Sequence, residues 1–527
     1  MAKILVSDPI SQEGVGILKQ IGQVDVKTGM PKEDLIACIG EYDALAVRSE
    51  TKVTAEVIAA AKKLKIIGRA GVGVDNIDVA AASERGIIVV NSPEGNTMAA
   101  AEHTVAMLLA LSRCIAQANA SLKNGKWERG KYMGVEVYNK TLGVIGLGKI
   151  GREVAKRAQS FGMNVIACDP FLSEESAAAL GVERVDMDTL LARSDYITLH
   201  IPKTKETEKM LGDAAFAKMK DGVRIINVAR GGIIDEAAIL RAVESGKVAG
   251  AALDVFEVEK DPEAIKSLVD CEKILTTPHL GASTEEAQEK VAVDIAEQIV
   301  DVLKGKPARS AVNMPSVPAE TLAAVEPYLA LAERMGALLT QTMDGAIENL
   351  QIKYTGELAA MDTGTLTRAV LVGMFKPILA EAVNYVNAPI IAKNRGVQIS
   401  ESKAAEPSDY TSSICLIVKT DKGAREVCGT LFGKKDIRIV RLDGYDVDMI
   451  PEGFMLVALH IDKPGIIGKV GTLLGDKGIN IAAMHVGRKK AGQRAIMVLN
   501  VDSEIPAAIM SDIVKIDGIE SATLVKL

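Results

Sequence analysis

The chain has 527 residues, of which 48% are hydrophobic and 25% are charged, and its formal net charge is −7 at pH 7. Because one hydrophobic core rarely grows beyond about 250–300 residues, this length predicts three or four domains. The excess of acidic residues disfavours a general binder of nucleic acids or of anionic membranes, and no apolar run in the sequence reaches the length of a membrane span.

The N-terminal sequence MAKILVSDPI enters a strand-like segment directly. It lacks the basic region and long apolar stretch of a signal peptide, so we expect a cytoplasmic protein. The cysteines are scattered along the chain without a CxxC pair, and several lie in apolar segments. We therefore expect buried, reduced thiols, neither a disulfide framework nor a zinc site, at Cys38, Cys114, Cys168, Cys271, Cys415 and Cys428.

Residues 3–90 alternate short apolar runs with stretches of helical spacing. This rhythm predicts a parallel sheet wrapped by helices, ahead of any cofactor motif. The expected strands are 3–8, 44–49, 65–71 and 87–93, and the expected helices are 12–20, 54–63 and 78–85.

Residues 97–122 contain neither proline nor glycine, and their pattern predicts one long helix that is buried on several sides. A helix of this apolar character is typical of a subunit interface. His103 lies within it, and we interpret this histidine as a packed, hydrogen-bonded side chain.

Residues 141–170 read as strand, glycine turn, helix, strand and acid, which is the order of a dinucleotide site. Gly146 permits the tight turn, Gly148 lets the backbone approach a pyrophosphate, and Gly151 lets the helix pack closely on the strand. The pyrophosphate then lies on free N–H groups at the start of the helix. Asp169 is placed to accept hydrogen bonds from the ribose hydroxyls and to repel a 2′-phosphate, which favours NAD over NADP. The alternative is a turn of the same kind without a ligand.

Further strands are expected at 196–202, 223–230 and 248–256. Ligands bind at the carboxyl ends of such strands. Arg230 follows one strand, Asp254 and Glu259 follow the next, and His279 lies in the later segment TTPHLGAST.

This set of side chains suits a nicotinamide enzyme that acts on a 2-hydroxy acid. Arg230 is suited to bind a carboxylate in bidentate fashion, and His279 is suited to accept a proton from the hydroxyl group. Glu259 would orient the imidazole and stabilise its protonated form. A surface cluster of salt bridges is the alternative interpretation, and His200, at a strand near the cofactor turn, is the competing candidate for the base.

Seven motifs, in order, resemble those of the D-isomer-specific 2-hydroxyacid dehydrogenases. They run through the first 300 residues as GRAGVGVDNID (68–78), NSPEGNTMAAAEHT (91–104), GKWERGKYMG (125–134), TLGVIGLGKIGREVA (141–155), NVARGGIIDE (227–236), LDVFEVE (253–259) and TPHLGAST (277–284). The resemblance implies a Rossmann-type doubly wound cofactor domain inserted in a flavodoxin-like substrate domain. It also implies catalytic roles for Arg230, Glu259 and His279.

The same resemblance implies further binding residues. The NAD contacts would be Val72, Gly146, Gly148, Lys149, Ile150, Gly151, Asp169, Ile201, Val228, Ala229, Arg230, Asp254, His279, Leu280, Gly281 and Ala282. The residues that hold the substrate would be Arg48, Arg69, Asn96, Arg129 and Lys131. One departure is Glu259-Lys260, where the family usually has Glu-Pro, so the loop towards His279 is expected to differ in length or path.

The last third of the chain predicts two α+β units after a linker at 312–320. The first, to about residue 450, resembles an intervening allosteric substrate-binding domain, and residues 453–527 resemble an ACT domain, a small amino-acid-binding module. In the latter, His460, Asp462 and Asn480 are candidates to bind an effector, against the alternative of turn residues at a dimer interface. The expected domains are 1–96 with 284–311 for substrate, 97–283 for NAD, 312–451 intervening, and 452–527 regulatory.

The function implied by the resemblance is NAD-dependent oxidation of 3-phospho-D-glycerate to 3-phosphooxypyruvate, the first step of phosphorylated L-serine biosynthesis. L-serine would be the effector, and the enzyme would be a homo-oligomer, either a tetramer or a dimer, with no nucleic-acid, membrane or metal partner. A glycerate or hydroxypyruvate reductase is the alternative within this class. A nucleotide-sensing corepressor is the alternative outside it, although the chain lacks a disordered or basic interaction tail.

Overall fold

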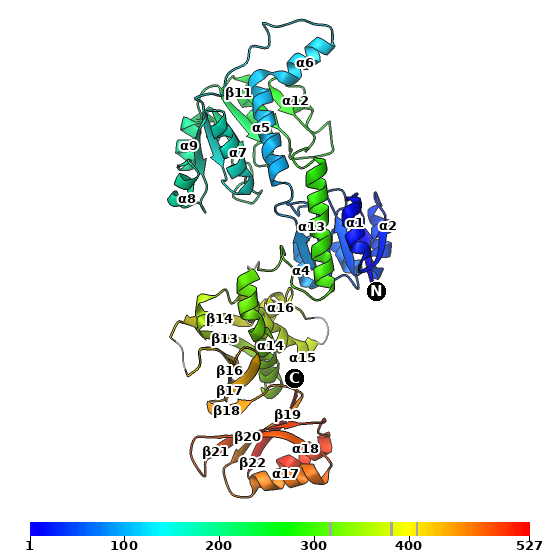
Figure 1. The fold of residues 1–527 in the computed structure, drawn as a ribbon, viewed down its shortest axis with the longest axis vertical. Coiled ribbons are helices and arrows are strands. Elements are labelled where there is room, and N and C mark those ends of the chain that lie inside the picture. The colour runs from blue at the N-terminus through cyan, green and yellow to red at the C-terminus, as the bar shows by residue number, and fades with distance from the viewer. Residues whose placement is uncertain (316–318, 380–382, 407–408) are drawn as a thin grey trace.

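The computed structural model describes residues 1–527 except 316–318, 380–382 and 407–408. The described residues form four sheets, each with its own helices, and the sheets are arranged along the long axis of the molecule (Figure 1). The second sheet, with α5 and α7, lies at one end and the C-terminal sheet at the other.

The first unit is a five-stranded parallel sheet in the order β2-β1-β3-β4-β5. Its apolar strands are buried on both faces, as expected of a sheet wrapped by helices. The predicted parallel sheet is confirmed, and it also contains β2 and α2, which the sequence analysis did not anticipate. The elements are β1 (Ala2–Val6), α1 (Gln12–Lys19), β2 (Gly22–Val26), α2 (Lys32–Cys38), the 3₁₀ turn Ile39–Glu41, β3 (Ala44–Val47), α3 (Ala55–Ala60), β4 (Ile66–Arg69), α4 (Val79–Glu84) and β5 (Ile88–Asn91).

The second unit is a seven-stranded parallel sheet in the order β12-β11-β10-β9-β6-β7-β8, with β6 beside the point where the strand order reverses. Its elements are α5 (Thr97–Arg113), α6 (Ile115–Lys123), β6 (Thr141–Ile145), α7 (Lys149–Ser160), β7 (Asn164–Cys168), α8 (Glu174–Ala179), β8 (Glu183–Arg184), α9 (Met187–Arg193), β9 (Tyr196–Leu199), α10 (Asp213–Lys218), β10 (Val223–Asn227), α11 (Glu236–Glu244), β11 (Val248–Leu253), α12 (Lys266–Val269) and β12 (Ile274–Thr276). Such an order places a ligand site at the carboxyl ends of β6 and β9.

After β12 the chain returns to the first unit through α13 (Glu285–Leu303), which packs on α1 and β4. Gly14 and Gly68 permit this packing, because a Cβ atom at Gly14 would lie 2.9 Å from the Ala292 carbonyl oxygen and one at Gly68 would lie 2.6 Å from Ile295 Cγ2. The first unit is therefore completed by a helix that follows the second unit in sequence.

The prediction of one long helix over 97–122 is wrong. The helix breaks at Cys114, whose φ of 52° is left-handed, and the axes of α5 and α6 differ by 64°. α5 stays in the core, whereas α6 exposes about half of Ile115 and of Leu122. Within the described part of the chain no single helix has the length and apolar character to cross a membrane, and only this bent pair meets those criteria jointly.

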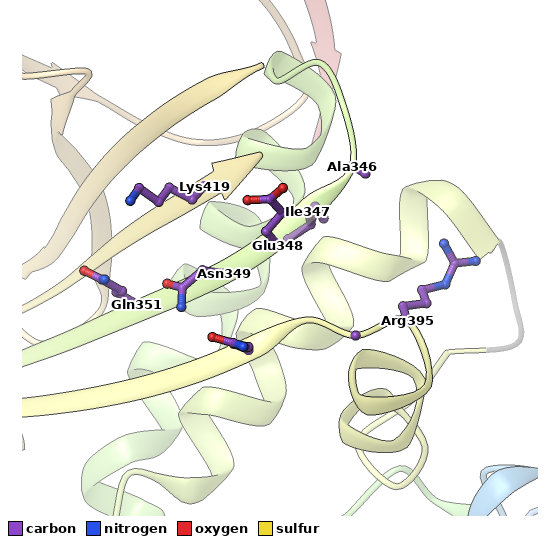
Figure 2. A pocket seen from close by; sticks show the side chains of 9 residues that line it. Ala346, Ile347, Glu348, Asn349, Gln351, Arg395 and Lys419 are labelled. Carbon is purple, nitrogen blue, oxygen red and sulfur yellow. The ribbon is translucent and has the colours of Figure 1, made fainter. Parts of the chain in front are cut away.

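The third unit is a six-stranded sheet in the order β14-β13-β15-β16-β17-β18, with α14 and α15 on one face. The outer face carries an open polar groove of about 620 Å³ near Asn349 and Lys419 (Figure 2). The elements are α14 (Ala319–Thr342), β13 (Ile347–Gly356), the 3₁₀ turn Glu357–Ala360, α15 (Gly364–Leu379), α16 (Ala388–Asn394), β14 (Gln398–Ala404), β15 (Ser412–Thr420), β16 (Gly423–Phe432), β17 (Asp436–Leu442) and β18 (Tyr445–Met449). Part of the predicted linker at 312–320 lies outside the described residues.

Two cysteines of this sheet correct the prediction of reduced thiols throughout. Cys415 on β15 lies directly opposite Cys428 on β16, with Cα atoms 4.1 Å apart, and the two form a disulfide. The other four cysteines are free thiols as predicted, but each is only partly buried, so the expectation of buried thiols is wrong for them. The sequence pattern hid this pair, because antiparallel register brings together residues that are 13 positions apart.

The fourth unit has the order strand, helix, two strands, helix and strand, as predicted, and its antiparallel sheet reads β20-β21-β19-β22. One face of this sheet packs under α17 and α18, and the other contributes Met455, Val457 and Ile496 to the core of the third unit. The elements are β19 (Phe454–Ile461), α17 (Ile466–Asp476), β20 (Ile481–Arg488), β21 (Arg494–Val501), α18 (Ala507–Val514) and β22 (Ile519–Lys526).

Candidate active site

The glycine turn between β6 and α7 has the shape that a dinucleotide site needs. Gly146 has a φ of 90°, and a Cβ atom there would meet Ile201 and the His200 carbonyl. Gly148 precedes α7, where no side chain of the described residues caps the first N–H groups, and no described atom lies within 4 Å of the position that its Cβ would take. These free donors beside open space fit a bound pyrophosphate.

Asp169 lies at the end of β7 and is tied to the glycine turn. Its Oδ2 accepts from the Leu147 N–H at 2.8 Å, and its Oδ1 accepts from the Phe171 N–H at 2.8 Å. Each carboxylate oxygen keeps a second lone pair, so the side chain is still able to accept hydrogen bonds from a ribose. The geometry fits the acid predicted for NAD.

Replacing Asp169 by Ala should relax the choice of cofactor. The change removes the charge that repels a 2′-phosphate, so we expect the ratio of kcat/KM for NADP to that for NAD to rise by about tenfold or more. Initial rates with each cofactor measure this ratio. Equal use of NADP and NAD by the parent chain would contradict our interpretation of the acid.

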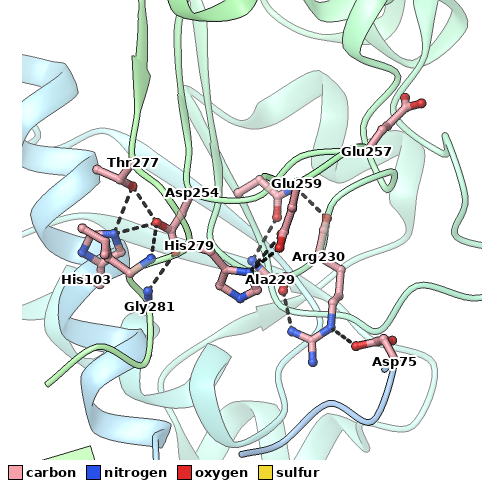
Figure 3. Close-up of polar contacts among 12 residues, drawn as sticks. Asp75, His103, Ala229, Arg230, Asp254, Glu257, Glu259, Thr277, His279 and Gly281 are labelled. Carbon is pink, nitrogen blue, oxygen red and sulfur yellow. Dashed lines mark hydrogen bonds and ion pairs between the residues drawn. The ribbon is translucent and has the colours of Figure 1, made fainter. Parts of the chain in front are cut away.

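The predicted catalytic side chains lie on loops after β10, β11 and β12. Asn227 organises the first of these loops, since its amide nitrogen donates to the Arg230 carbonyl at 2.9 Å and its oxygen accepts from the Ala229 N–H at 3.0 Å. Gly231 lets this loop approach the backbone of Phe256, and a Cβ atom at Gly281 would lie 3.0 Å from Val228 Cγ1. The loops are thus packed against one another, as Figure 3 shows.

His279 and Glu259 form a pair at this edge. The imidazole Nδ1 lies 2.9 and 3.0 Å from the two carboxylate oxygens, and both side chains are partly exposed. A carboxylate only accepts, so Nδ1 carries the hydrogen and Nε2 of the neutral ring is the free acceptor. His279 holds a left-handed φ of 55°, a conformation that surrounding contacts must maintain.

The loop between the two residues follows a path that proline would forbid. Lys260 has a φ of 67°, whereas a proline ring fixes φ near −65°. Lysine at this position is compatible with a left-handed backbone that a proline ring would not adopt.

Arg230 lies in a cluster of cations at the same edge. Its Nη1 donates to the Ala229 carbonyl at 2.7 Å, its Nε lies 3.3 Å from Asp75 Oδ2, and its Nη2 lies against Gly73 (Figure 3). The cluster also contains Arg69 and Arg48. Burial, followed by the nearby positive charges of Arg230 and Arg48, lowers the pKa of Arg69 to about 10. Arg69 thus remains charged at neutral pH, and the cluster suits an anionic ligand.

Two residues absent from the sequence prediction shape this cluster. The buried carboxylate of Asp8 accepts from the backbone N–H groups of Arg48, at 2.6 Å, and of Thr51. Asn76 donates to the Arg48 carbonyl at 2.8 Å and accepts from Arg69 Nε at 3.3 Å. Both follow the carboxyl end of a strand, which is the one signal in the sequence that pointed to them.

The other predicted binding residues are distributed more widely. Val72 accepts from the Asn91 amide, and Lys149 forms an ion pair with Glu94 at 2.6 Å. Asn96 precedes α5, and its Oδ1 is buried without a partner among the described residues. Ile150 lies in the first turn of α7, whereas Ile201, Val228, Leu280 and Ala282 lie in the loops that follow β9, β10 and β12.

Arg129 and Lys131 lie in the exposed segment that follows α6. Lys131 forms an ion pair with Glu272 at 2.7 Å. Within the described part of the chain no hydrogen bond or ion pair connects either residue to the arginine cluster. The structure therefore does not bring these two predicted substrate contacts to the site of their own chain.

Asp254, a predicted NAD contact, is fully buried, and its carboxylate is satisfied within the chain. Thr277 Oγ1 donates to it at 2.6 Å, and the N–H groups of Leu280 and Gly281 donate at 2.7 and 2.9 Å. Burial alone would raise the pKa of Asp254, but hydrogen bonds from His103, Thr277 and the Leu280 N–H outweigh it and hold the pKa below its ordinary value. The residue is an ionised anchor for the segment that carries His279.

His200, the competing candidate for the base, follows β9. Its Nε2 lies 3.0 Å from Thr198 Oγ1, and burial lowers the pKa of His200 to about 4. A base with so low a pKa is poorly matched to proton transfer at neutral pH.

The lowered pKa of His200 also predicts how the folding stability of the chain depends on pH in the acidic range. The unfolded chain binds a proton on His200 below about pH 6.5 and the folded chain only below about pH 4, so stability is lost as the pH falls through that window. We expect thermal unfolding temperatures between pH 7 and pH 4 to fall less steeply in His200→Gln than in the parent. A variant with the parental slope would contradict the assignment.

The predicted effector residues lie at strand ends of the fourth unit, with His460 and Asp462 at the end of β19 and Asn480 just before β20. His460 is buried on β19, with Nδ1 3.0 Å from the Ile461 carbonyl and with Nε2 unpartnered among the described residues. Asp462 pairs with Arg488 at 3.1 Å, and Asn480 donates to Asp502 at 2.7 Å. A separate groove of about 590 Å³ lies between α17 and α18, beside Gly465 and Lys469.

The fold and the glycine turn define a dinucleotide-binding domain, and comparison with known proteins assigns it to the nicotinamide-dependent dehydrogenases. Residues 105–281 match the family model "D-isomer specific 2-hydroxyacid dehydrogenase, NAD binding domain", residues 324–443 match "D-3-phosphoglycerate dehydrogenase intervening domain", and residues 454–518 match "ACT domain". The predicted resemblance is therefore confirmed in each of these regions.

Relatives match over the whole length. The D-3-phosphoglycerate dehydrogenase of Synechocystis is 51% identical over 100% of this chain and 95% of its own, and that of Archaeoglobus fulgidus is 50% identical over 100% of both. A D-lactate dehydrogenase structure from Aquifex aeolicus, complexed with NAD and lactic acid, is 30% identical, with a TM-score of 0.53 over 60% of this chain and 100% of its own. The chain belongs to the D-3-phosphoglycerate dehydrogenase family, and it is an NAD-dependent oxidoreductase.

Proposed function

We propose that the chain oxidises 3-phospho-D-glycerate to 3-phosphooxypyruvate, the first step of phosphorylated L-serine biosynthesis. The observation that carries this proposal is the cluster of Arg48, Arg69 and Arg230 beside the His279–Glu259 pair. A substrate with a carboxylate, a phosphate and a 2-hydroxyl group matches these charges and this base. The names of the full-length relatives support the same substrate.

Each residue then has a defined task. Arg230 binds the carboxylate, with its guanidinium oriented by Asp75 and Gly73. His279 accepts the hydroxyl proton at Nε2, while Glu259 holds Nδ1 and stabilises the positive charge that forms. A bound nicotinamide would supply the acceptor for the hydride from C2, so the alcohol would lose one proton and one hydride in total.

Arg48, Arg69 and Asn96 would bind the remaining anionic group from the substrate unit. Burial and the nearby charges of Arg230 and Arg48 lower the pKa of Arg69, so a bound anion would relieve the repulsion among these cations. The unpartnered Oδ1 of Asn96 is able to accept from a ligand hydroxyl.

The segment after α6 supports assembly into a homo-oligomer. It exposes 83% of Trp127, 85% of Met133 and 63% of Tyr138, and it projects from the cofactor unit at the far end of the molecule (Figure 1). A second copy would cover these side chains, and Arg129 and Lys131 would then reach the substrate of the partner. Light scattering of the purified chain measures its oligomeric state, and a monomer would contradict this proposal.

L-serine is the effector that we propose for the C-terminal domain, at His460, Asp462 and Asn480. The ACT match and the unpartnered Nε2 of His460 support an amino-acid site there. Initial rates with and without L-serine test this proposal, with D-serine as the matched control. Equal rates in all three conditions would contradict it.

The substrate itself is tested by comparing kcat/KM for 3-phospho-D-glycerate with that for D-glycerate, which lacks only the phosphate. We expect a preference of about a hundredfold or more, because the arginine cluster would be left without its counter-charge. An equal or better rate with D-glycerate would indicate a glycerate or hydroxypyruvate reductase instead.

A further inference from the structure

The segment that carries His279 is held by one buried carboxylate. Asp254 accepts from Thr277 Oγ1 and from the backbone N–H groups of Leu280 and Gly281, and its own carbonyl accepts from the His279 N–H at 2.9 Å. Residues on both sides of His279 are thus bound to the same aspartate. The left-handed backbone at His279 depends on these contacts.

A further contact to this anchor comes from a distant helix. His103 on α5 has its Nε2 3.2 Å from Asp254 Oδ1 and 3.3 Å from Thr277 Oγ1 (Figure 3). It lies 151 residues before Asp254 in sequence. The three side chains form one closed network between α5 and the segment that carries His279.

The donors and acceptors available in this network determine the direction of each hydrogen bond. Asp254 is ionised and only accepts, and the Thr277 hydroxyl donates its single hydrogen to it. The Nε2 atom of His103 must therefore carry a hydrogen and donate it to the carboxylate and the hydroxyl. Among the described residues, His103 and Thr277 are the two side chains that donate to this carboxylate, and its other donors are backbone N–H groups.

The position of His103 makes this contact sensitive to the packing of α5. The helix packs on α7, which follows the glycine turn, and on β11, which ends at Leu253, the residue before Asp254. The imidazole is 21% exposed, whereas the carboxylate is fully buried. Loss of the donor would leave a buried carboxylate with one partner fewer, which weakens the whole anchor.

We propose that His103 is a positioning residue for His279, which acts by donating a hydrogen bond to the Asp254–Thr277 pair. The proposal rests on the proposed function, in which His279 accepts the substrate proton. His103 does not touch the substrate in this account. It fixes the segment 277–281 so that Nε2 of His279 meets the hydroxyl group.

Two variants separate the hydrogen bond from simple packing. His103→Leu fills much of the same volume without a donor, and His103→Gln keeps an N–H near the place of Nε2. We expect kcat of His103→Leu to fall about tenfold, with the dissociation constant of NADH within about threefold of the parent's and a lower unfolding temperature from the lost hydrogen bond, and we expect His103→Gln to recover kcat to within about threefold. If His103→Leu fails to fold, Thr277→Val removes the same link and should lower kcat similarly.

The proposal is overturned if His103→Leu keeps kcat within about twofold of the parent. It is also overturned if the Leu and Gln variants lose equal activity, because shape alone would then matter. His279→Gln separates a failure of the positioning role of His103 from a failure of the proposed base. If that variant is inactive while His103→Leu is parental, only the positioning role fails, whereas a parental rate in His279→Gln would remove the proposed base itself.

Discussion

Replacing His279 by Gln is expected to lower kcat by about a thousandfold. Glutamine keeps a polar side chain of similar reach, but it cannot accept a proton from the substrate hydroxyl, and general base catalysis contributes about 10²–10⁴ in rate. Because His279 lies on a loop that the packed neighbours Val228 and Asp254 support, the fold should persist. Steady-state rates with NAD and 3-phospho-D-glycerate measure the loss.

The control for this variant is the affinity for NADH, followed by the quenching or enhancement of its fluorescence. Asp169 bonds to the Leu147 and Phe171 N–H groups and not to the imidazole, so we expect the dissociation constant to change by about threefold at most. Glu259→Gln should be intermediate, since it keeps an acceptor for Nδ1 but loses the charge. An unchanged kcat in His279→Gln would remove His279 from the mechanism.

Arg230→Lys is expected to lower kcat/KM for the substrate by about a hundredfold or more. Lysine keeps the charge but loses the planar fork that binds a carboxylate through two parallel hydrogen bonds. The contacts to the Ala229 carbonyl and Asp75 would also be lost, so the remaining ammonium would no longer be held in place.

Steady-state kinetics with the substrate varied at saturating NAD provide the measurement. Lys203→Arg, a change at an exposed ion pair with Glu208, is the matched control and should behave as the parent. If Arg230→Lys retains parental kcat/KM, Arg230 does not bind the substrate carboxylate, and the cluster of Arg48 and Arg69 would have to do so.

The cofactor site was predictable because its signal is local. Residues 141–170 contain a complete unit of strand, turn, helix, strand and acid, and each glycine has its expected environment in the structure. The pairing of Glu259 with His279 was predictable for a related reason, since both follow strands of one parallel sheet and must meet at its carboxyl edge.

The features that sequence reasoning missed all depend on tertiary contacts. No proline or glycine near Cys114 indicates that the helix breaks there. The Cys415–Cys428 disulfide depends on the register of two strands. Asp8 and Asn76 look like ordinary loop residues until their bonds to the backbone near Arg48 are seen. His103 was expected to be packed and hydrogen-bonded, which is confirmed, but its partner Asp254 was predicted only as an NAD contact.

One measurement tests the central claim most directly. The purified chain is incubated with NAD and with 3-phospho-D-glycerate that carries deuterium at C2, and the nicotinamide product is analysed by mass spectrometry. If hydride passes from C2 to the cofactor, the product is deuterated NADH, formed in equal amount to 3-phosphooxypyruvate, and turnover is slower than with the unlabelled substrate wherever that transfer limits the rate. Absence of NADH formation, or NADH without deuterium, would contradict the account.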